Sequence, residues 1–105
     1  MVKTKVANKS EIKEGQGKLV SVNGKELALF NVKGEFFIID NACIHRGGSL
    51  SDGFLEENNV TCPLHGWQYD VKTGQNTMPG MGKLNSYKLI VEGEDIFIED
   101  SISED

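Results

Sequence analysis

Two short stretches set the chemistry that this chain can support: residues 43–48 read CIHRGG, and residues 62–67 read CPLHGW. Together they hold both cysteines and both histidines of the 105-residue chain. Each stretch supplies one thiol and one imidazole, as C-x-H and as C-x-x-H, with sixteen residues between His45 and Cys62. Thiolates and neutral imidazoles bind Zn, Fe or an iron–sulfur cluster rather than Mg or Ca. The sequence therefore predicts one site with four metal ligands: Cys43, His45, Cys62 and His65.

The ligand spacing bears on which metal is bound. Structural zinc sites commonly have two to four residues between paired cysteines, as in C-x₂₋₄-C, or three to five between paired histidines, as in H-x₃₋₅-H. The C-x-H pair has only one residue between its ligands, which is tight for two ligands on one ion. A two-iron cluster removes this difficulty if both cysteines bind one iron and both histidines bind the other. A structural zinc site remains an alternative. A disulfide between Cys43 and Cys62 is another, but it would leave both histidines unexplained.

The sequence on either side of these stretches predicts β-strands. Asn23-Gly24 lies between two apolar runs, which is a strong hairpin signal. No window shows a sustained apolar period of 3.6, and the only candidate for a helical turn is residues 10–14. We therefore expect an all-β sandwich or barrel of about eight to ten short strands. The predicted strands include residues 27–32, 36–39, 86–91 and 95–99, with turns at 33–35 and 92–94.

Length and charge exclude several classes of protein. A chain of 105 residues predicts a single domain over residues 1–105, with little room for a deep catalytic cavity. The net charge of −5 argues against nucleic acid and anionic membrane as partners. No stretch approaches the roughly 18–20 apolar residues of a membrane span. Residues 1–5 lack the apolar run of a signal peptide, so we expect a cytoplasmic protein.

The complete pattern resembles the Rieske ferredoxins of bacterial and archaeal oxygenase systems. The resemblance rests on C-x-H-x₁₆-C-x-x-H, with Arg46-Gly47-Gly48 after the first histidine and Gly66-Trp67 after the second, and it extends almost from end to end. It implies an antiparallel β-sandwich with two cluster-binding loops at one tip. It also implies a [2Fe–2S] cluster bound by Cys43, His45, Cys62 and His65.

Three features distinguish this chain within the wider family. It lacks the additional cysteine that respiratory Rieske proteins place in each loop, where it has Gly48 and Leu64. It keeps a tyrosine at Tyr69, where the soluble ferredoxins often have phenylalanine. We expect a reduction potential toward the low end of the family range, raised somewhat if the Tyr69 hydroxyl donates to the Cys43 sulfur. In residues 78–82, MPGMG, only Pro79 matches the family's usual covering loop, so this segment is either a shield for the cluster or a simple connector.

The resemblance implies a one-electron carrier with no turnover of its own. Its expected partners are a flavin-dependent reductase and a terminal oxygenase, and we expect a monomer. One alternative is a small subunit of a larger redox enzyme such as nitrite reductase, although such subunits often lack the full ligand set. A structural zinc module is the other alternative. We do not expect an oxygenase, because no second, mononuclear-iron domain follows residue 105.

Overall fold

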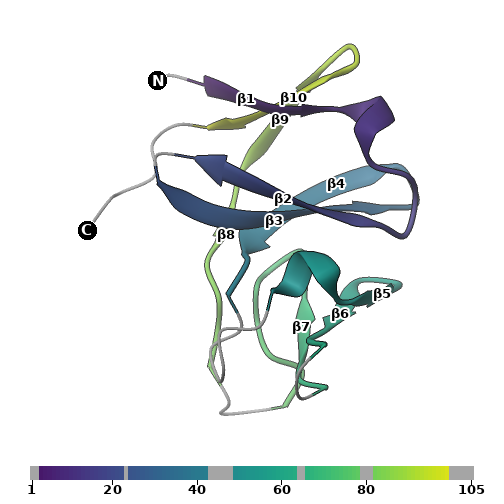
Figure 1. Ribbon diagram of the computed structural model, residues 1–105, viewed down its shortest axis with the longest axis vertical. Helices are drawn as coiled ribbons and strands as arrows, with labels where there is room; N and C mark the ends of the chain where they lie inside the picture. Colours follow the sequence, from purple (N-terminus) through teal and green to yellow (C-terminus); the bar gives the residue numbers. More distant parts are fainter. Residues whose placement is uncertain (1–2, 23, 43–48, 64–65, 79–81, 100–105) are drawn as a thin grey trace.

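The computed structural model describes residues 3–22, 24–42, 49–63, 66–78 and 82–99, which form ten strands and two short 3₁₀ helices (Figure 1). The strands are β1 (Lys3–Asn8), β2 (Gly17–Val22), β3 (Lys25–Val32), β4 (Glu35–Asp40), β5 (Phe54–Glu56), β6 (Asn59–Thr61), β7 (Gln68–Asp70), β8 (Ser86–Tyr87), β9 (Leu89–Glu92) and β10 (Asp95–Glu99). The 3₁₀ helices are η1 (Lys9–Glu11) and η2 (Leu50–Asp52). The predicted all-β class is confirmed.

The strands form three antiparallel sheets. Their orders are β1-β10-β9, β2-β3-β4-β8 and β5-β6-β7. Figure 1 shows the four-stranded sheet in the middle of the molecule, with β1, β9 and β10 above it and β5, β6 and β7 below it. No helix within the described ranges is long and apolar enough to cross a membrane.

Two tight hairpins build the central sheet, and local turn chemistry explains both. Val22 pairs with Lys25, so β2 and β3 are joined by the two residues Asn23-Gly24, and Gly24 has a φ of 82°. Val32 pairs with Glu35 around Lys33 and Gly34, whose φ angles are 53° and 94°. Two consecutive positive φ values characterise the type I′ turn, whose twist matches that of the flanking strands. Both predicted hairpins are therefore confirmed.

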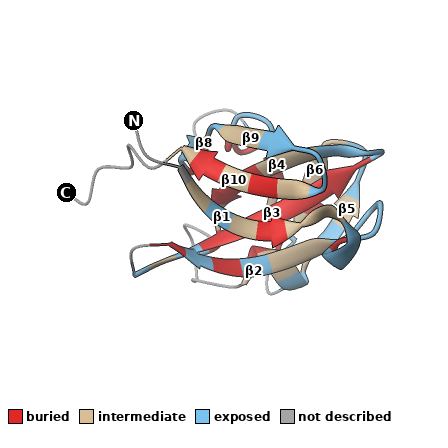
Figure 2. Ribbon diagram, turned by 90° about the horizontal axis from the view of Figure 1, so that it is seen from above, coloured by how far each residue is buried: buried red, intermediate tan, exposed pale blue. Residues whose placement is uncertain are grey.

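Strand β3 is buried on both of its faces, and Figure 2 shows this burial along the strand. Leu27 and Leu29 pack with β1, β2 and β10 in one core cluster, whereas Ala28 and Phe30 pack into a second cluster with Cys62 and Tyr69. Successive side chains of a strand point to opposite faces, so one strand serves two cores. This double burial explains the nearly continuous apolar run of residues 27–32.

Residues 86–91 were expected to form one strand that pairs with residues 95–99 across a turn at 92–94. The hairpin is confirmed, because β9 pairs with β10, but the prediction of a single continuous strand is wrong. The segment divides at Lys88: β8 pairs with β4 in the central sheet, and β9 pairs with β10 in the outer sheet. The chain crosses here from one sheet to the other. Strands β5 and β6 were not predicted. The helical turn expected at residues 10–14 is η1, which starts earlier, at Lys9, and is capped by Asn8.

Candidate metal centre

Of the four predicted ligands, the structure describes Cys62 alone. Cys43, His45 and His65 lie outside the described residues, as do Gly47, Gly48 and Pro79. The structure does show how the chain is held where it enters and leaves the two predicted ligand loops. Within the described ranges, no three or more His, Cys, Asp or Glu side chains gather in a group suited to a metal ion.

Asn41 holds together the residues that flank the first ligand loop, 41–42 and 49–51, which we call the base of the first loop. Its side chain is buried, its Nδ2 donates to Ser49 Oγ (3.1 Å), and its Oδ1 accepts from Ser51 N–H (2.9 Å). The Leu50 N–H also donates to the Asn41 carbonyl (2.9 Å), and Ala42 forms a β-bridge with Ser49. The two ends of segment 43–48 are therefore held together by both backbone and side-chain hydrogen bonds.

The second loop is closed directly at Cys62. The Cys62 N–H donates to the Trp67 carbonyl (2.7 Å), and the Gly66 N–H donates to the Cys62 carbonyl (3.0 Å). Gly66 has a φ of 77°, in the left-handed region that glycine adopts without steric cost. The glycine is thus required by the turn that returns the chain to β7.

The two loop bases lie against each other. Leu50, just after the first loop, and Cys62 are members of the same buried cluster. Gly53 lies so close to β6 that a Cβ atom there would overlap the Thr61 carbonyl oxygen. Thr61 immediately precedes Cys62, so this close approach fixes the exit of the first loop beside the start of the second.

Asp40, two residues before the first loop's β-bridge, is tied to β8. Tyr87 Oη donates to Asp40 Oδ1 (2.6 Å), and the Asn85 N–H donates to Asp40 Oδ2 (3.0 Å). Burial, together with the hydrogen bond to Asp40 and its negative charge, raises the pKa of Tyr87 from 10.0 to about 12. The protonated phenol is therefore the form that stabilises the folded state.

We expect the Tyr87→Phe variant to lose about 1 kcal/mol of unfolding free energy at pH 8, because the hydrogen bond to Asp40 is removed. The folded pKa of Tyr87 lies above its unfolded value. Its stabilisation is therefore complete below pH 10 and is lost as the pH rises from 10 toward 12. Urea unfolding of both proteins at pH 8 and at pH 11 should show a smaller difference at pH 11. A difference that is equal at the two pH values would contradict this assignment.

The cysteine that the structure describes is suited to an iron–sulfur ligand. The Cys62 side chain is 1% exposed, and its thiol forms no disulfide with any residue in the part of the chain that the structure describes. It lies among apolar side chains at the tight turn with Gly66, where a bound cluster would be shielded from water on this side. The thiol of Cys62 and its apolar surroundings both fit the iron of a [2Fe–2S] site that cysteines bind.

Tyr69 and Trp67 pack on the same side of the second loop, as the alternation of residues 67–69 predicts. Tyr69 is completely buried in the cluster that contains Cys62, and Trp67 packs against that cluster. Packing is therefore a demonstrated role of Trp67. In residues 78–82, Met78 is exposed and the structure does not describe residues 79–81, so the two interpretations of this segment stay open.

Asn76 is a buried polar residue that the sequence analysis missed. It forms a β-bridge with Tyr69, and its Nδ2 has no hydrogen-bond partner among the residues that the structure describes. An asparagine in a polar stretch carries no sequence signal of burial. Only the pairing of residues 75–77 with β7 brings it inside.

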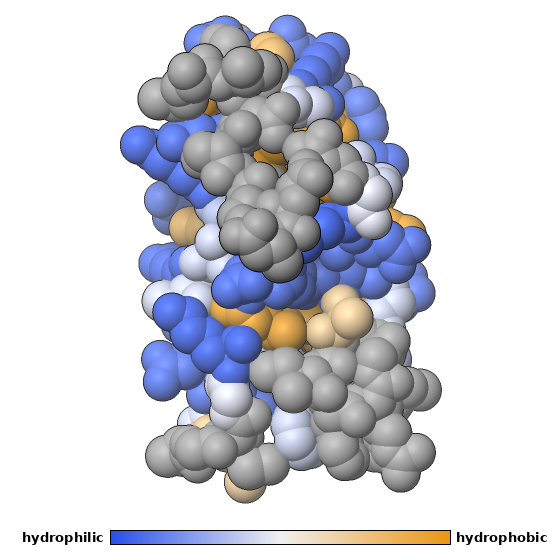
Figure 3. All heavy atoms as spheres, turned by 90° about the vertical axis from the view of Figure 1, so that its left-hand side faces the viewer, coloured by the Kyte–Doolittle hydropathy of each residue, from blue (hydrophilic) through white to orange (hydrophobic). Residues whose placement is uncertain are grey.

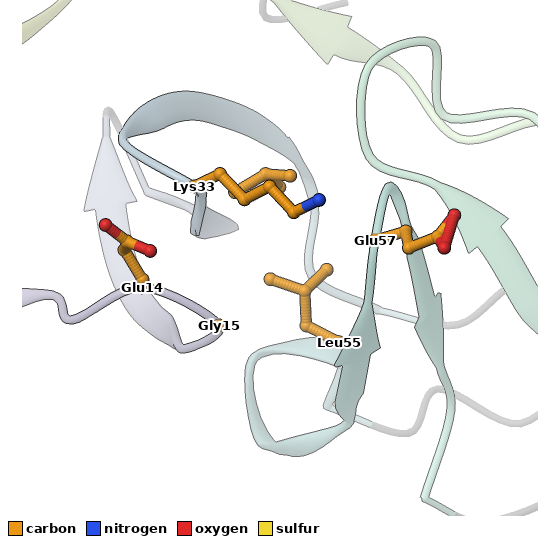
Figure 4. Close-up of a pocket in the computed structure, with 6 residues that line it drawn as sticks. Glu14, Gly15, Lys33, Leu55 and Glu57 are labelled. Carbon is orange, nitrogen blue, oxygen red and sulfur yellow. The ribbon is translucent and has the colours of Figure 1, made fainter.

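Two open hollows indent the described surface. One of about 260 Å³ is lined by Glu14, Gly15, Val32, Lys33, Leu55 and Glu57, and Figure 4 shows Lys33 extending toward the turn that carries Glu57. None of its lining residues belongs to either loop base. The other, of about 380 Å³, is lined by Asn59, Asp70, Gln75, Asn76 and Thr77.

Comparisons with known proteins identify the family of this chain. The model of the Rieske [2Fe–2S] domain matches residues 2–88. The ferredoxin component of the naphthalene 1,2-dioxygenase system of Pseudomonas aeruginosa is 42% identical over 90 residues, covering 85% of this chain and 86% of that protein. The ferredoxin of carbazole 1,9a-dioxygenase from Nocardioides aromaticivorans superposes with a TM-score of 0.87 at 27% identity, covering 93% of this chain and 97% of the other. A chain in a complex of reduced oxygenase and oxidised ferredoxin of carbazole 1,9a-dioxygenase gives a TM-score of 0.85 at 27% identity, covering 92% of each chain. The chain therefore belongs to the family of Rieske [2Fe–2S] domain proteins.

Proposed function

We propose that this protein carries single electrons from a flavin-dependent reductase to a terminal oxygenase, by means of a [2Fe–2S] cluster. In this proposal Cys43 and Cys62 bind one iron, and His45 and His65 bind the other. The observation that carries it is the C-x-H-x₁₆-C-x-x-H pattern on two loops whose bases are closed by hydrogen bonds and packed together. The similar proteins support it, because they are ferredoxin components of dioxygenase systems, and one was solved in complex with its oxygenase.

The residues around the site perform three tasks. Burial of Cys62 removes its sulfur from water, and the turn closed by Gly66 holds its backbone. Asn41 holds the ends of the first loop at a constant separation. A bound cluster supplies the one-electron chemistry. A site that moves little between oxidation states transfers electrons with little reorganisation, which is what a carrier requires.

We also infer that residues 1–105 form one domain that is monomeric in the cytoplasm. The exposed large apolar residues of the described chain are Leu19, Phe54, Met78 and Val91. Leu19, Phe54 and Val91 lie on three different sheets. In Figure 3, the described residues on one face are largely hydrophilic, with an apolar area just below the middle and smaller ones above it. Single exposed apolar residues are normal on monomers, whereas obligate interfaces have large contiguous apolar patches.

The cluster is tested by the EPR spectrum of the dithionite-reduced protein, together with iron and acid-labile sulfide analysis. We expect a rhombic signal of the histidine-ligated [2Fe–2S] type, with two irons and two sulfides per chain. One zinc per chain and no signal would support the structural zinc module and would overturn electron carriage.

Electron carriage itself is tested by mixing the reduced protein anaerobically with a terminal oxygenase of the dioxygenase class. The visible spectrum should show oxidation of this protein matched by reduction of the oxygenase's own centre. If this protein is oxidised at the same rate with and without the oxygenase, the proposed partner is wrong. A bound subunit of another redox enzyme would then be the better interpretation.

Tyr69 offers a test of how the protein sets its reduction potential. If the Tyr69 hydroxyl donates to a sulfur ligand, it stabilises the reduced, more negative state. Tyr69→Phe should then lower the potential by about 20–60 mV, which corresponds to the 0.5–1.5 kcal/mol of one hydrogen bond. Spectroelectrochemical titration measures the shift, and Tyr87→Phe is the matched control, with an unchanged potential. If Tyr69→Phe also leaves the potential unchanged, the hydroxyl does not act on the cluster.

A further inference from the structure

Asn76 lies in a row of buried side chains that crosses three adjacent segments. Val60 on β6 pairs with Tyr69 on β7, and Tyr69 forms a β-bridge with Asn76. Residues directly opposite each other in antiparallel pairing have their side chains on the same face. Val60 and Tyr69 are fully buried and Asn76 is 5% exposed, so this shared face is the interior one.

The same face carries Cys62. Cys62 lies two residues beyond Val60, at the spacing that returns a side chain to the same side of the strand. Val60, Tyr69 and Cys62 belong to one buried cluster, which is consistent with this alternation. Asn76 therefore shares an interior face with the cysteine that the proposed function makes an iron ligand.

The oxygen of the Asn76 carboxamide is held on the side of the residue that leads toward the Cys62 end of the sheet. Its Oδ1 accepts a hydrogen bond from the Met78 N–H (2.8 Å), and the Thr77 N–H donates to the Gln68 carbonyl (3.0 Å). From Asn76 to Met78 the segment thus runs from the level of Tyr69, past Gln68, toward Trp67. The Trp67 carbonyl is the group that accepts from the Cys62 N–H.

The Nδ2 of Asn76 is exceptional among buried side-chain polar atoms. It has no hydrogen-bond partner among the described residues, whereas Asn31 Nδ2 donates to the Ile12 carbonyl (2.9 Å) and Asn41 Nδ2 donates to Ser49 Oγ (3.1 Å). The atom is also inaccessible to solvent. A buried donor without an acceptor destabilises the folded state, and native proteins rarely leave one unpaired. An acceptor on this side of the sheet is therefore expected.

We propose that Asn76 Nδ2 donates a hydrogen bond to a sulfur of the cluster site, either the Cys62 thiolate or a sulfide beside it. This inference rests on the proposed ligand set. Sulfur that carries negative charge is an acceptor, and it becomes a stronger one when the site gains an electron. The hydrogen bond therefore stabilises the reduced form and raises the reduction potential. Asn76 acts here as a residue that adjusts the potential and takes no part in ligation.

The direct test is pulsed EPR of the dithionite-reduced protein in which asparagine carries ¹⁵N in its side-chain amide. We expect a ¹⁵N hyperfine coupling in the natural sequence that is lost in Asn76→Ala and in Asn76→Asp. Asn76→Asp keeps an oxygen for the Met78 N–H and so limits damage to the fold. Asn31→Ala is the matched control: it removes another buried asparagine that lines neither loop base, and it should keep the coupling.

The potential provides a second measurement. At a fixed applied potential, the ratio of reduced to oxidised protein should fall by about threefold to tenfold in Asn76→Ala and stay constant in Asn31→Ala. It should fall by at least as much in Asn76→Asp, because a carboxylate there also repels the added electron. A tenfold change corresponds to 59 mV for one electron. A Rieske-type signal without any asparagine side-chain coupling, or with a coupling that persists in the Asn76 variants, overturns this inference and leaves the proposed function intact. Loss of the Rieske-type signal from the natural sequence would overturn the proposed function itself.

Discussion

Cys62→Ala is expected to abolish the cluster, so that the purified variant contains less than a tenth of the iron and acid-labile sulfide of the natural sequence. The reason is the absence of a substitute ligand. The chain has two cysteines and two histidines, and the proposed site uses all of them. The side chain at this position is 1% exposed, so bulk water is poorly placed to take over coordination. One thiolate would be left where the site requires two.

The measurement is iron and sulfide per chain together with the reduced EPR signal. Val71→Ala is the matched control, because Val71 is completely buried in the same cluster and has no ligand atom. It should lose about 1.5–2.5 kcal/mol of unfolding free energy from its missing methyl groups and still keep two irons. Retention of two irons by Cys62→Ala would remove Cys62 from the ligand set.

Those features of the fold that short segments determine by themselves could be predicted from the sequence. Asn23-Gly24 and Lys33-Gly34 form hairpins because their backbone preferences favour the required turns, whatever surrounds them. The resemblance also placed Cys62 in a loop, and the structure shows that a turn closes this loop at Cys62. The prediction that Cys43, His45 and His65 join Cys62 remains a prediction, because those three residues lie outside the described part of the chain.

The features that were missed depend on distant partners. Strands β5 and β6 have three residues each and meet within the polar run Glu56–Asn59, which shows no alternation. Their turn places Glu57 at a φ of 56° without the glycine that usually announces such a turn. Strands β5 and β6 form because β6 also pairs with β7 in the same sheet. The division at Lys88 likewise depends on distant strands. Strand β8 pairs with β4 at the edge of the central sheet, whereas β9 pairs with β10 at the edge of another sheet.

Gly53→Ala is expected to lower the free energy of unfolding by about 1–3 kcal/mol, the usual cost of forcing extra atoms into a packed interior. The backbone of Gly53 is extended, with a φ of −80°, so any residue can adopt its conformation and the cost is purely steric. An added Cβ would overlap the Thr61 carbonyl oxygen, with Val60 Cγ2 at 3.1 Å and the Leu50 carbonyl oxygen at 3.2 Å. Two of these three contacts are backbone atoms, which cannot rotate away.

The added Cβ atom should displace the backbone at Thr61, and this displacement should also reach the metal centre. Thr61 immediately precedes Cys62, and Gly53 follows the first loop. Urea unfolding measures the loss of stability, and the line shape of the reduced EPR signal reports the change at the cluster. Gly93→Ala is the control: Gly93 lies in the β9–β10 turn with a φ of 62° and open space around its Cβ position. It should lose roughly 1 kcal/mol from backbone strain and keep the EPR line shape. If Gly53→Ala behaves in the same way as Gly93→Ala, the contact between Gly53 and β6 does not hold the two loop bases together.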